Sequence, residues 1–463
     1  MTDTSVGSSQ RPLRVAVVGS GPAGFYAAGA LFKQKDYEVT VDLFERLPCP
    51  YGLVRYGVAP DHQKIKGVTR VFDKTASHPN FRLFANVHIG RDITADELRE
   101  HYDQVVLTVG CETDRRMAIP GENGDGCYAA TSFVAWYNGH PDYQNYSVNL
   151  EVPRAAIIGV GDVSMDITRM LVKGAEALAT TDITEQALTT LRRSQIRDVY
   201  IVARRGWAQS AFAQKELSDI AALPHVQVHV DAEQVSRDLE AHPDLSSIAK
   251  RKLEYLVDLG KQAPRRDATH HVHFRFLRSP KELTLRDGKV DALDLEENTL
   301  VRSDDGWLSA QGTGNIESLA VGAVFRAVGY RGVPLPGLPF DQRRGLIPND
   351  SGRVVDAETG ERVPGVYASG WIKRGPSGVI GTNKTDSVET VSKMLEDVPT
   401  LTVSSSANES PSIDELIKTR NIQVIDLPRW QTLDTIERER GSSKNKVREK
   451  LTSAEAAWQA LGG

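Results

Sequence analysis

The sequence predicts an α/β fold of two domains, each built on a parallel sheet, with the second domain inserted into the first. A strand, a glycine-rich turn and a helix follow one another twice, with turns at residues 19–24 and 159–164. Two further segments, residues 105–110 (VVLTVG) and 324–329 (VFRAVG), resemble each other, since each is a strand that ends in glycine. Strands that alternate with helices are typical of parallel sheets. The two similar segments mark where the chain would leave one domain and return to it.

These crossings give the predicted domain boundaries. The chain leaves the first domain near residue 112 and returns near residue 335. Residues 13–112 and 336–463 are expected to form one discontinuous domain, and residues 113–335 the inserted one. We expect residues 1–12 to be a disordered tail. Residues 402–412 (TVSSSANESPS) are expected to be a flexible surface loop because small polar residues dominate them.

The first repeat consists of a strand, a turn, a helix and a second strand, over residues 14–18, 19–24, 23–32 and 39–44. Gly19 permits the tight turn, Gly21 lets the backbone approach a pyrophosphate, and Gly24 lets the helix pack closely on the strand. Glu45 ends the second strand, where a carboxylate can accept hydrogen bonds from ribose hydroxyls. The pattern therefore predicts a dinucleotide site for a bare ribose, as in FAD or NAD.

The second repeat has the same order, over residues 154–158, 159–164, 165–172 and 199–202. Gly159 and Gly161 take the first two glycine positions, and Ser164, which is also small, takes the third. Its second strand ends at Arg204 and Arg205 instead of an acid. Two guanidinium groups suit the 2′-phosphate of NADP. Two dinucleotide sites in one chain indicate hydride transfer between two cofactors, FAD and NADP.

Composition excludes several classes of protein. The chain has 463 residues and a net charge of −5 with interspersed signs, which does not favour nucleic acid as the main partner. No uncharged apolar run is long enough to span a bilayer, and the N-terminus lacks the apolar core of a secretory signal. The three cysteines form no CxxC pair, which argues against a redox dithiol, an iron–sulfur cluster or a zinc site. We therefore expect a reduced, cytoplasmic setting, with no metal site.

Four long motifs carry a resemblance to a known family. The chain resembles the ferredoxin–NADP reductases of the adrenodoxin reductase type, especially their actinobacterial members, through the segments ERLPCPYGLVRYGVAPDHQKIK, RRGWAQSAFAQKEL, GYRGVPLPGLPFD and GWIKRGPSGVIGTNK. The resemblance covers the chain from about residue 13 to its end. It implies two Rossmann-like dinucleotide-binding domains of the three-layer ββα type, with the NADP domain inserted in the FAD domain. It also implies that NADPH gives hydride to FAD, which passes single electrons to a separate iron–sulfur protein.

The resemblance also assigns residues to each site. For FAD it implies the first turn together with Glu45 and later contacts, namely Gly19, Gly21, Pro22, Ala23, Gly24, Glu45, Leu53, Val87, Trp371, Gly378, Val379 and Ile380. A helix that starts near residue 380 is expected to aim its N–H groups at the flavin. For NADP it implies Arg115, Gly159, Gly161, Asp162, Val163, Arg204, Arg205, Glu216 and Gly378. His62 and Asp166 match polar groups near the flavin and are the predicted catalytic residues, with Asp166 or Asp219 as candidates to orient His62.

One residue departs from the family pattern. The family usually has Asn at the position of Asp162, and a carboxylate there should repel a pyrophosphate unless it faces away or serves as an N-cap. This puts NADP affinity, but not the fold, in question.

The expected partner is a small acidic ferredoxin. Candidate basic contacts for it are Lys250, Arg251, Lys252, Arg265 and Arg266. The oligomeric state stays open.

Three alternatives remain. A flavin monooxygenase needs the same two dinucleotides, and the electron-input subunit of a larger synthase would share the fold but carry cluster cysteines. A flavoprotein redox sensor or scaffold would bind FAD and a protein partner without turnover. The arginine pair disfavours the sensor. NADPH oxidation and oxygen use coupled to hydroxylation would separate these alternatives.

Overall fold

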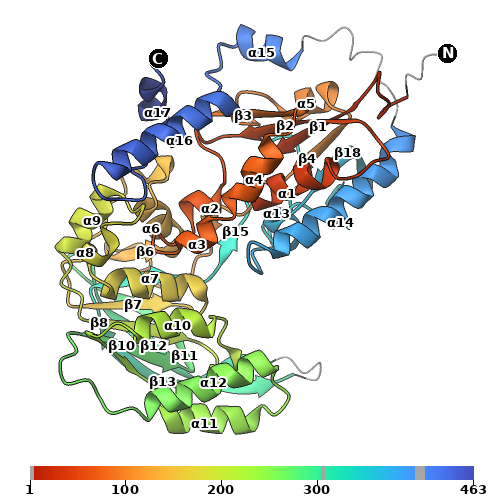
Figure 1. Cartoon of the computed structure of the whole chain (residues 1–463). Helices are drawn as coiled ribbons and strands as arrows, with labels where there is room; N and C mark the ends of the chain where they lie inside the picture. The colour runs from red at the N-terminus through yellow and green to blue at the C-terminus, as the bar shows by residue number, and fades with distance from the viewer. Residues whose placement is uncertain (1–4, 304–307, 402–411, 463) are drawn as a thin grey trace. The chain divides into compact units, whose positions relative to one another are not determined.

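The computed structural model describes residues 5–303, 308–401 and 412–462, and the chain divides into two compact units (Figure 1). Unit 1 comprises residues 1–113, 138–144 and 330–463, and unit 2 comprises residues 114–137 and 145–329. Among the described residues, none of the helices combines the length and apolar character needed to cross a membrane. The chain crosses between the units at β5 (Thr113–Asp114), on either side of residues 138–144, and immediately before β15 (Tyr330–Arg331).

Unit 1 is built on a sheet of seven strands in the order β16-β17-β18-β4-β1-β2-β3. The five strands from β18 to β3 pair in parallel, and β16 and β17 are antiparallel additions. In chain order the strands are β1 (Leu13–Val18), β2 (Val39–Glu45), β3 (Phe81–Ala85), β4 (Gln104–Leu107), β16 (Asn349–Asp350), β17 (Arg353–Val355) and β18 (Arg362–Ala368).

Helices cover both faces of this sheet. Val15 and Val17 of β1 belong to one buried cluster, and Ala16 and Val18 to the other, as the two-residue period of a strand requires. The unit's helices are α1 (Pro22–Leu31), α2 (Leu53–Tyr56), α3 (Gln63–Lys66), α4 (Thr69–Ala76), α5 (Ala95–His101), η1 (Pro141–Tyr143), α13 (Trp371–Arg374), α14 (Thr382–Asp397), η3 (Val398–Thr400), α15 (Ile413–Thr419), α16 (Leu427–Ser442) and α17 (Ala454–Ala460). Helices α1 and α14 lie side by side although they come from opposite ends of the chain (Figure 1).

A buried ion-pair network attaches α16 to α2. Glu437 of α16 is fully buried and accepts hydrogen bonds from Arg55 of α2, at 2.5 Å in the shorter contact, and from Arg448, at 2.8 Å. Burial and the two guanidinium groups act in opposite directions on the Glu437 carboxyl, and the net effect is a lowered pKa. These ion pairs therefore connect α16 to α2, which lies in the segment that follows Glu45.

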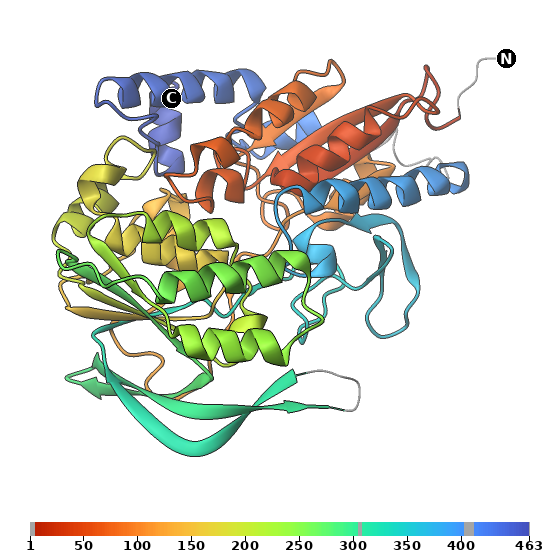
Figure 2. The same ribbon diagram turned by 60° about the horizontal axis from the view of Figure 1, so that its bottom comes forward.

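Unit 2 is built on a six-stranded, wholly parallel sheet in the order β6-β14-β7-β8-β10-β9. A separate antiparallel sheet, β11-β12-β13, forms a long twisted ribbon (Figure 2). The strands are β6 (Cys127–Ala129), β7 (Arg154–Ile158), β8 (Asp198–Ala203), β9 (Val226–His229), β10 (His270–Phe276), β11 (Arg278–Arg286), β12 (Lys289–Arg302), β13 (Leu308–Ala320) and β14 (Ala323–Arg326).

The ribbon packs on the parallel sheet to give the predicted ββα layering. Ile158 and Val202 of the sheet share a buried cluster with Leu293 and Leu319 of the ribbon. Helices pack on the six-stranded sheet as the third layer, with α7 against β7 and both α10 and α12 against β9. The helices are α6 (Ala130–Tyr137), α7 (Asp162–Val172), α8 (Ala175–Leu178), α9 (Glu185–Arg192), η2 (Trp207–Gln209), α10 (Gln214–Ala221), α11 (Ala232–Ala241) and α12 (Ser247–Gly260).

Two boundary predictions differ from the structure. Residues 5–12 are not a disordered tail, because Gly7 accepts a hydrogen bond from the Glu38 amide at 2.8 Å and Arg11 forms an ion pair with Asp103 at 2.6 Å. Residues 138–144 belong to unit 1 rather than to the inserted unit, and Asn138 accepts a hydrogen bond from Lys66 at 3.3 Å. Residues 402–411 of the predicted flexible loop lie outside the described residues.

Candidate functional site

The first glycine turn has three glycines with two different roles. Gly19 has φ +108°, and a Cβ there would lie 2.7 Å from the Thr108 carbonyl oxygen. A Cβ on Gly24 would collide with the Gly19 carbonyl oxygen. Gly21, the N-cap of α1, has open space where a Cβ would point. Gly19 and Gly24 are therefore required by the fold, while Gly21 leaves a free face at a helix N-terminus, where a phosphate group fits.

Glu45 is buried at the end of β2 and is already bonded to the turn. One carboxylate oxygen accepts hydrogen bonds from the amide of Ser20 at 3.1 Å and from its hydroxyl at 2.6 Å. The other oxygen accepts one from the Leu47 amide at 2.9 Å. Burial raises the pKa of the Glu45 carboxyl against the opposing effect of these bonds. A carboxylate has about four acceptor positions, so capacity remains for a ribose hydroxyl.

Residues from the C-terminal part of the chain contact the first glycine turn. Gly370 has φ +80°, and a Cβ there would lie 2.6 Å from the Ala23 side chain. The Ser387 hydroxyl donates to the Ala23 carbonyl at 3.0 Å. Asp386 accepts from the Gly370 amide and from the Ser369 hydroxyl, the latter at 3.1 Å. Ala23, which follows Pro22 at the start of α1, is thus contacted by residues from the C-terminal part of unit 1.

The later residues predicted to contact FAD lie on α13 and in the turn before α14. Trp371 begins α13 and donates from its indole nitrogen to the Ser377 carbonyl at 3.2 Å. Gly378 has φ +77°, and Val379 is 68 % exposed. The first amides of α14 donate to the carbonyls of Val379, Ile380 and Gly381 at 3.0, 3.2 and 3.1 Å. These amides are bonded within the chain, so the expectation that they point freely at a ligand does not hold in this structure.

The other predicted residues of unit 1 lie at different depths. Leu53, the first residue of α2, is partly exposed, and Gly52 before it approaches Gly21 closely. Val87 is buried, and its amide donates to the Glu45 carbonyl at 2.9 Å. Val87 is therefore in direct contact with the end of β2. His62 is half-buried at the N-cap of α3 and belongs to unit 1, whereas Asp166 belongs to unit 2.

The second glycine turn, in unit 2, repeats the division of roles. Gly159 has φ +127°, and a Cβ there would collide with the Ala327 carbonyl oxygen. Gly161 has open space where a Cβ would point and is the N-cap of α7. Ser164 is buried, as the third, small residue of such a turn should be. Val163 lies between Gly161 and Ser164, in the first turn of α7. The residues present therefore fit a second dinucleotide.

The arginine pair directly follows β8. Arg204 is exposed and Arg205 is half-buried. Their carbonyls accept hydrogen bonds from the side-chain amide of Asn298 at 3.0 Å and from the Leu277 amide at 3.2 Å, so their backbone is fixed to the ribbon side of the unit. Arg115 is also exposed, and its amide donates to the Gly329 carbonyl at 3.1 Å.

Asp162 is not an N-cap. Gly161 holds that position, and Asp162 is the first helical residue of α7. One oxygen of its carboxylate accepts a hydrogen bond from the Ala213 amide at 2.8 Å. The side chain is therefore directed to the segment before α10 (Gln214–Ala221).

A buried arginine that the sequence did not single out joins two of the predicted residues. Arg169 is 2 % exposed and contacts Asp166 at 2.5 Å and Glu216 at 2.8 Å. Burial raises the pKa of the Glu216 carboxyl. Asp219, the other suggested partner of His62, forms an ion pair with Lys215 at 2.6 Å. The spacing of Asp166 and Arg169 on one helix was the signal available for this contact.

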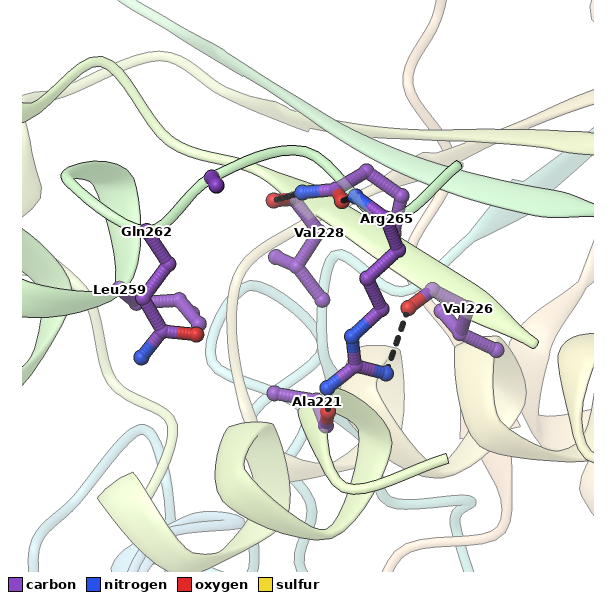
Figure 3. Close-up of a pocket in the computed structure, with 8 residues that line it drawn as sticks. Ala221, Val226, Val228, Leu259, Gln262 and Arg265 are labelled. Carbon is purple, nitrogen blue, oxygen red and sulfur yellow. Dashed lines mark hydrogen bonds between the residues drawn. The ribbon is translucent and has the colours of Figure 1, made fainter. Parts of the chain in front are cut away.

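Two of the predicted ferredoxin contacts have structural roles instead. Lys252 is 7 % exposed and donates to the Ser210 carbonyl at 2.6 Å. Arg265 donates to the carbonyls of Ala221 at 2.6 Å and Val226 at 3.0 Å beside a small pocket (Figure 3). The prediction of a free basic surface is wrong for Lys252, whereas Arg265 is exposed although its guanidinium group is bonded to backbone carbonyls. Arg251 and Arg266 are exposed, and Lys250 is half-buried.

Comparison with known proteins shows the family. The family model described as pyridine nucleotide-disulphide oxidoreductase matches residues 13–263. The chain is 42 % identical over 448 residues to "NADPH-ferredoxin reductase FprA" of Mycobacterium leprae, covering 94 % of this chain and 96 % of the relative. It is 38 % identical over 460 residues to "NADPH:adrenodoxin oxidoreductase, mitochondrial" of Arabidopsis thaliana, covering 97 % of this chain and 95 % of the relative.

The fold agrees with a solved relative. The structure of Mycobacterium tuberculosis FprA in complex with NADPH matches with a TM-score of 0.90 at 39 % identity, over 98 % of this chain and 100 % of that one. The match includes both units and both glycine turns. The chain therefore belongs to the pyridine nucleotide-disulphide oxidoreductase family, among the ferredoxin–NADP reductases of the adrenodoxin reductase type.

Proposed function

We propose that the protein is an NADPH-dependent flavoprotein reductase that passes electrons from NADPH, by way of bound FAD, to a ferredoxin. The observation that carries this function is the pair of glycine turns with open faces at Gly21 and Gly161. One turn is followed by a strand that ends in a buried carboxylate, and the other by a strand that two arginines directly follow. The full-length similarity to NADPH-ferredoxin and adrenodoxin reductases supports the same function.

Unit 1 provides the FAD site. The open face of Gly21 and the N-terminus of α1 accept the pyrophosphate, and Glu45 accepts hydrogen bonds from the ribose. Trp371, Gly378, Val379 and Ile380 supply the C-terminal wall, held to the turn through Gly370 and Ser387. Bound FAD supplies the conversion between two-electron hydride chemistry and one-electron transfer.

Unit 2 provides the NADPH site. Arg204 and Arg205 bind the 2′-phosphate, and Arg115 binds near the pyrophosphate that the turn at Gly161 accepts. His62 and Asp166 are the proposed catalytic residues, with Asp166 held in place by Arg169. Imidazole exchanges protons near neutral pH, which suits His62 to hold or release a proton at its ring nitrogens during the reaction.

The acceptor is a separate iron–sulfur protein. We propose an acidic ferredoxin in the cytoplasm, with Lys250, Arg251 and Arg266 as the remaining candidate contacts after Lys252 and Arg265 are set aside. Charge complementarity of this kind raises the association rate and makes it dependent on salt.

The deciding experiment is reduction of the purified flavoprotein without oxygen. We expect NADPH to bleach the visible spectrum much faster than NADH does. Arg204→Ala and Arg205→Ala should each lower kcat/KM for NADPH by about tenfold or more, because each removes a charge-assisted hydrogen bond to the 2′-phosphate. The rate with NADH should not change. Arg193→Ala, at an exposed position of the same unit, is the matched control.

Other outcomes identify the alternatives. A flavin that neither nucleotide reduces would support the redox sensor. Oxygen consumption coupled to hydroxylation of a substrate would support the monooxygenase.

A further inference from the structure

The segment of residues 206–213 (GWAQSAFA) joins the arginine pair to α10. It follows Arg205 directly and precedes the helix that carries Glu216. Trp207 is 2 % exposed, and its ring packs against that of Phe276 with centroids 4.0 Å apart and the planes tilted by 30°. The Ala208 amide donates to the Asp238 carboxylate at 2.9 Å. The beginning of the segment is therefore anchored in the core and to α11.

The end of the segment is attached to the second glycine turn at two points. The Ala211 amide donates to the Val160 carbonyl at 3.0 Å, inside the turn. The Ala213 amide donates to the Asp162 carboxylate at 2.8 Å. Because the segment begins at the arginine pair, these two bonds connect the arginines with the turn that would hold the pyrophosphate.

Lys252 of α12 contacts the opposite edge of the same segment. Its ammonium group donates to the Ser210 carbonyl at 2.6 Å and to the Phe212 carbonyl at 3.3 Å, and lies 4.9 Å from the Phe212 ring centroid. The amides of alternate residues thus face the turn while the carbonyls between them face the lysine, as in an extended strand. A buried ammonium is costly unless it is hydrogen-bonded, so this contact determines the local conformation.

We propose that Lys252 and Asp162 are positioning residues for NADPH, which fix the 206–213 segment so that the arginine pair and the second glycine turn form one binding surface. The inference rests on the proposed function. It assigns the buried lysine to the nucleotide site instead of to ferredoxin docking. It also assigns the carboxylate that departs from the family pattern to a contact with the protein backbone.

The arrangement makes nucleotide affinity depend on pH. Burial lowers the pKa of Lys252 to about 8, and the charge of Asp162 on α7 partly opposes this shift. The ammonium is present below that pH and is lost as the pH rises through it, so the contacts to both carbonyls weaken above about pH 8. Carboxylates titrate far below this range in ordinary settings. Affinity for the 2′-phosphorylated nucleotide should therefore fall between pH 7 and 9.5.

The test is calorimetric titration of the FAD-loaded protein with 2′,5′-ADP, which carries the adenosine, the 2′-phosphate and a 5′-phosphate. We expect Lys252→Met to weaken binding by about tenfold, which is about 1.4 kcal/mol, and to remove the fall in affinity between pH 7 and 9.5. Lys261→Met, an exposed lysine at the C-terminal end of the same helix, should bind as the wild type does. If Lys252→Met only weakened the fold, 2′,5′-ADP would bind less tightly at every pH, and the fall in affinity between pH 7 and 9.5 would remain.

Asp162 gives an independent variant. Asp162→Asn keeps an oxygen for the Ala213 amide and should retain binding, whereas Asp162→Ala should weaken it. If Lys252→Met fails to fold, the Asp162 pair and the pH dependence of the wild type decide the outcome. Wild-type affinity that stays constant to pH 9.5, or equal binding by Asp162→Asn and Asp162→Ala, overturns the inference. Failure of the wild type to bind 2′,5′-ADP at all contradicts the proposed function itself.

Discussion

The three glycines of the first turn have consequences of two different kinds. A Cβ on Gly24 meets backbone atoms that cannot move without disturbing β1 and α1, while a Cβ on Gly19 meets the backbone of the neighbouring strand end at Thr108. Gly21, between them, faces open space. The same sequence motif therefore combines positions required for folding with a position required for binding.

A pair of alanine variants separates these roles. Gly24→Ala should destabilise the protein by about 1–3 kcal/mol because it overpacks the helix–strand contact. Gly21→Ala should leave the unfolding transition of the FAD-free protein unchanged and should reduce FAD retention after gel filtration. Urea unfolding and the ratio of visible to ultraviolet absorbance measure the two effects. Equal loss of stability in both variants would contradict the assignment.

Residues next to regular elements were predictable from the sequence, and residues bonded across the fold were not. Glu45 and the arginine pair could be singled out because Glu45 ends a strand and the arginines directly follow one, each in a recognisable repeat. The contact of Arg169 with Glu216 and the structural role of Lys252 depend on partners 40 to 47 positions away along the chain. A lysine on an amphipathic helix gives no signal that its ammonium group will bind backbone carbonyls. Only the packed structure brings those groups together.

At the scale of elements, the C-terminal helix α16 is attached through charge rather than through apolar packing alone. Glu437 is buried between Arg55 and Arg448. Arg55 stands two residues after Leu53, the first residue of α2. The ion pair between Arg55 and Glu437 therefore also fixes the start of α2 beside the first glycine turn.

Removing the charge of Glu437 should therefore be costly. Glu437→Gln leaves the buried Arg55 guanidinium group without its carboxylate, while Arg448 keeps its ion pair with Asp434 at 2.7 Å. We expect a loss of about 3–5 kcal/mol in the free energy of unfolding. Glu439→Gln, exposed on the same helix, should change it by less than about 0.5 kcal/mol. Urea denaturation of both variants provides the measurement. A small effect at Glu437 would mean that the arginines find other partners.

The sequence predicted the parallel strands more accurately than the elements that cover them. The strand over residues 154–158 agrees with β7 at both ends, and β1 begins one residue earlier than predicted. Continuous β-branched runs bounded by glycine are a strong local signal. The ribbon strands β11–β13 and the helices α15–α17 gave no such signal, because their burial depends on contacts with distant segments. The ordered residues 5–12 were missed for the same reason.

At the scale of the whole molecule, acid should destabilise unit 2. His229, His270 and His273 lie on the neighbouring strands β9 and β10, and burial lowers the pKa of each. The pKa of His270 falls to about 4, with Arg197 also lowering it. Each imidazole stays neutral in the fold but takes up a proton near pH 6.5 when the chain unfolds. Stability is therefore lost as the pH falls from about 6.5 towards 4.

The free energy of unfolding at pH 7.5, 6 and 5 measures this effect. His270→Gln should show a shallower decline with falling pH than the wild type, because one of the protons taken up on unfolding is removed. Parallel declines in the two proteins would show that this histidine does not contribute to the acid sensitivity.

The contact of Gly370 and Ser387 with Ala23 also bears on when the proposed flavin site is completed during synthesis. A ribosome releases residues in order, and compact units fold as they emerge. All of unit 2, which ends at residue 329, is outside the ribosome before the residues that enclose the first glycine turn have been made. The inserted unit can therefore fold while its host is incomplete. With the flavin at the proposed site, we expect its incorporation to be a late event, and a chain cut short before residue 370 to leave that site open on one side.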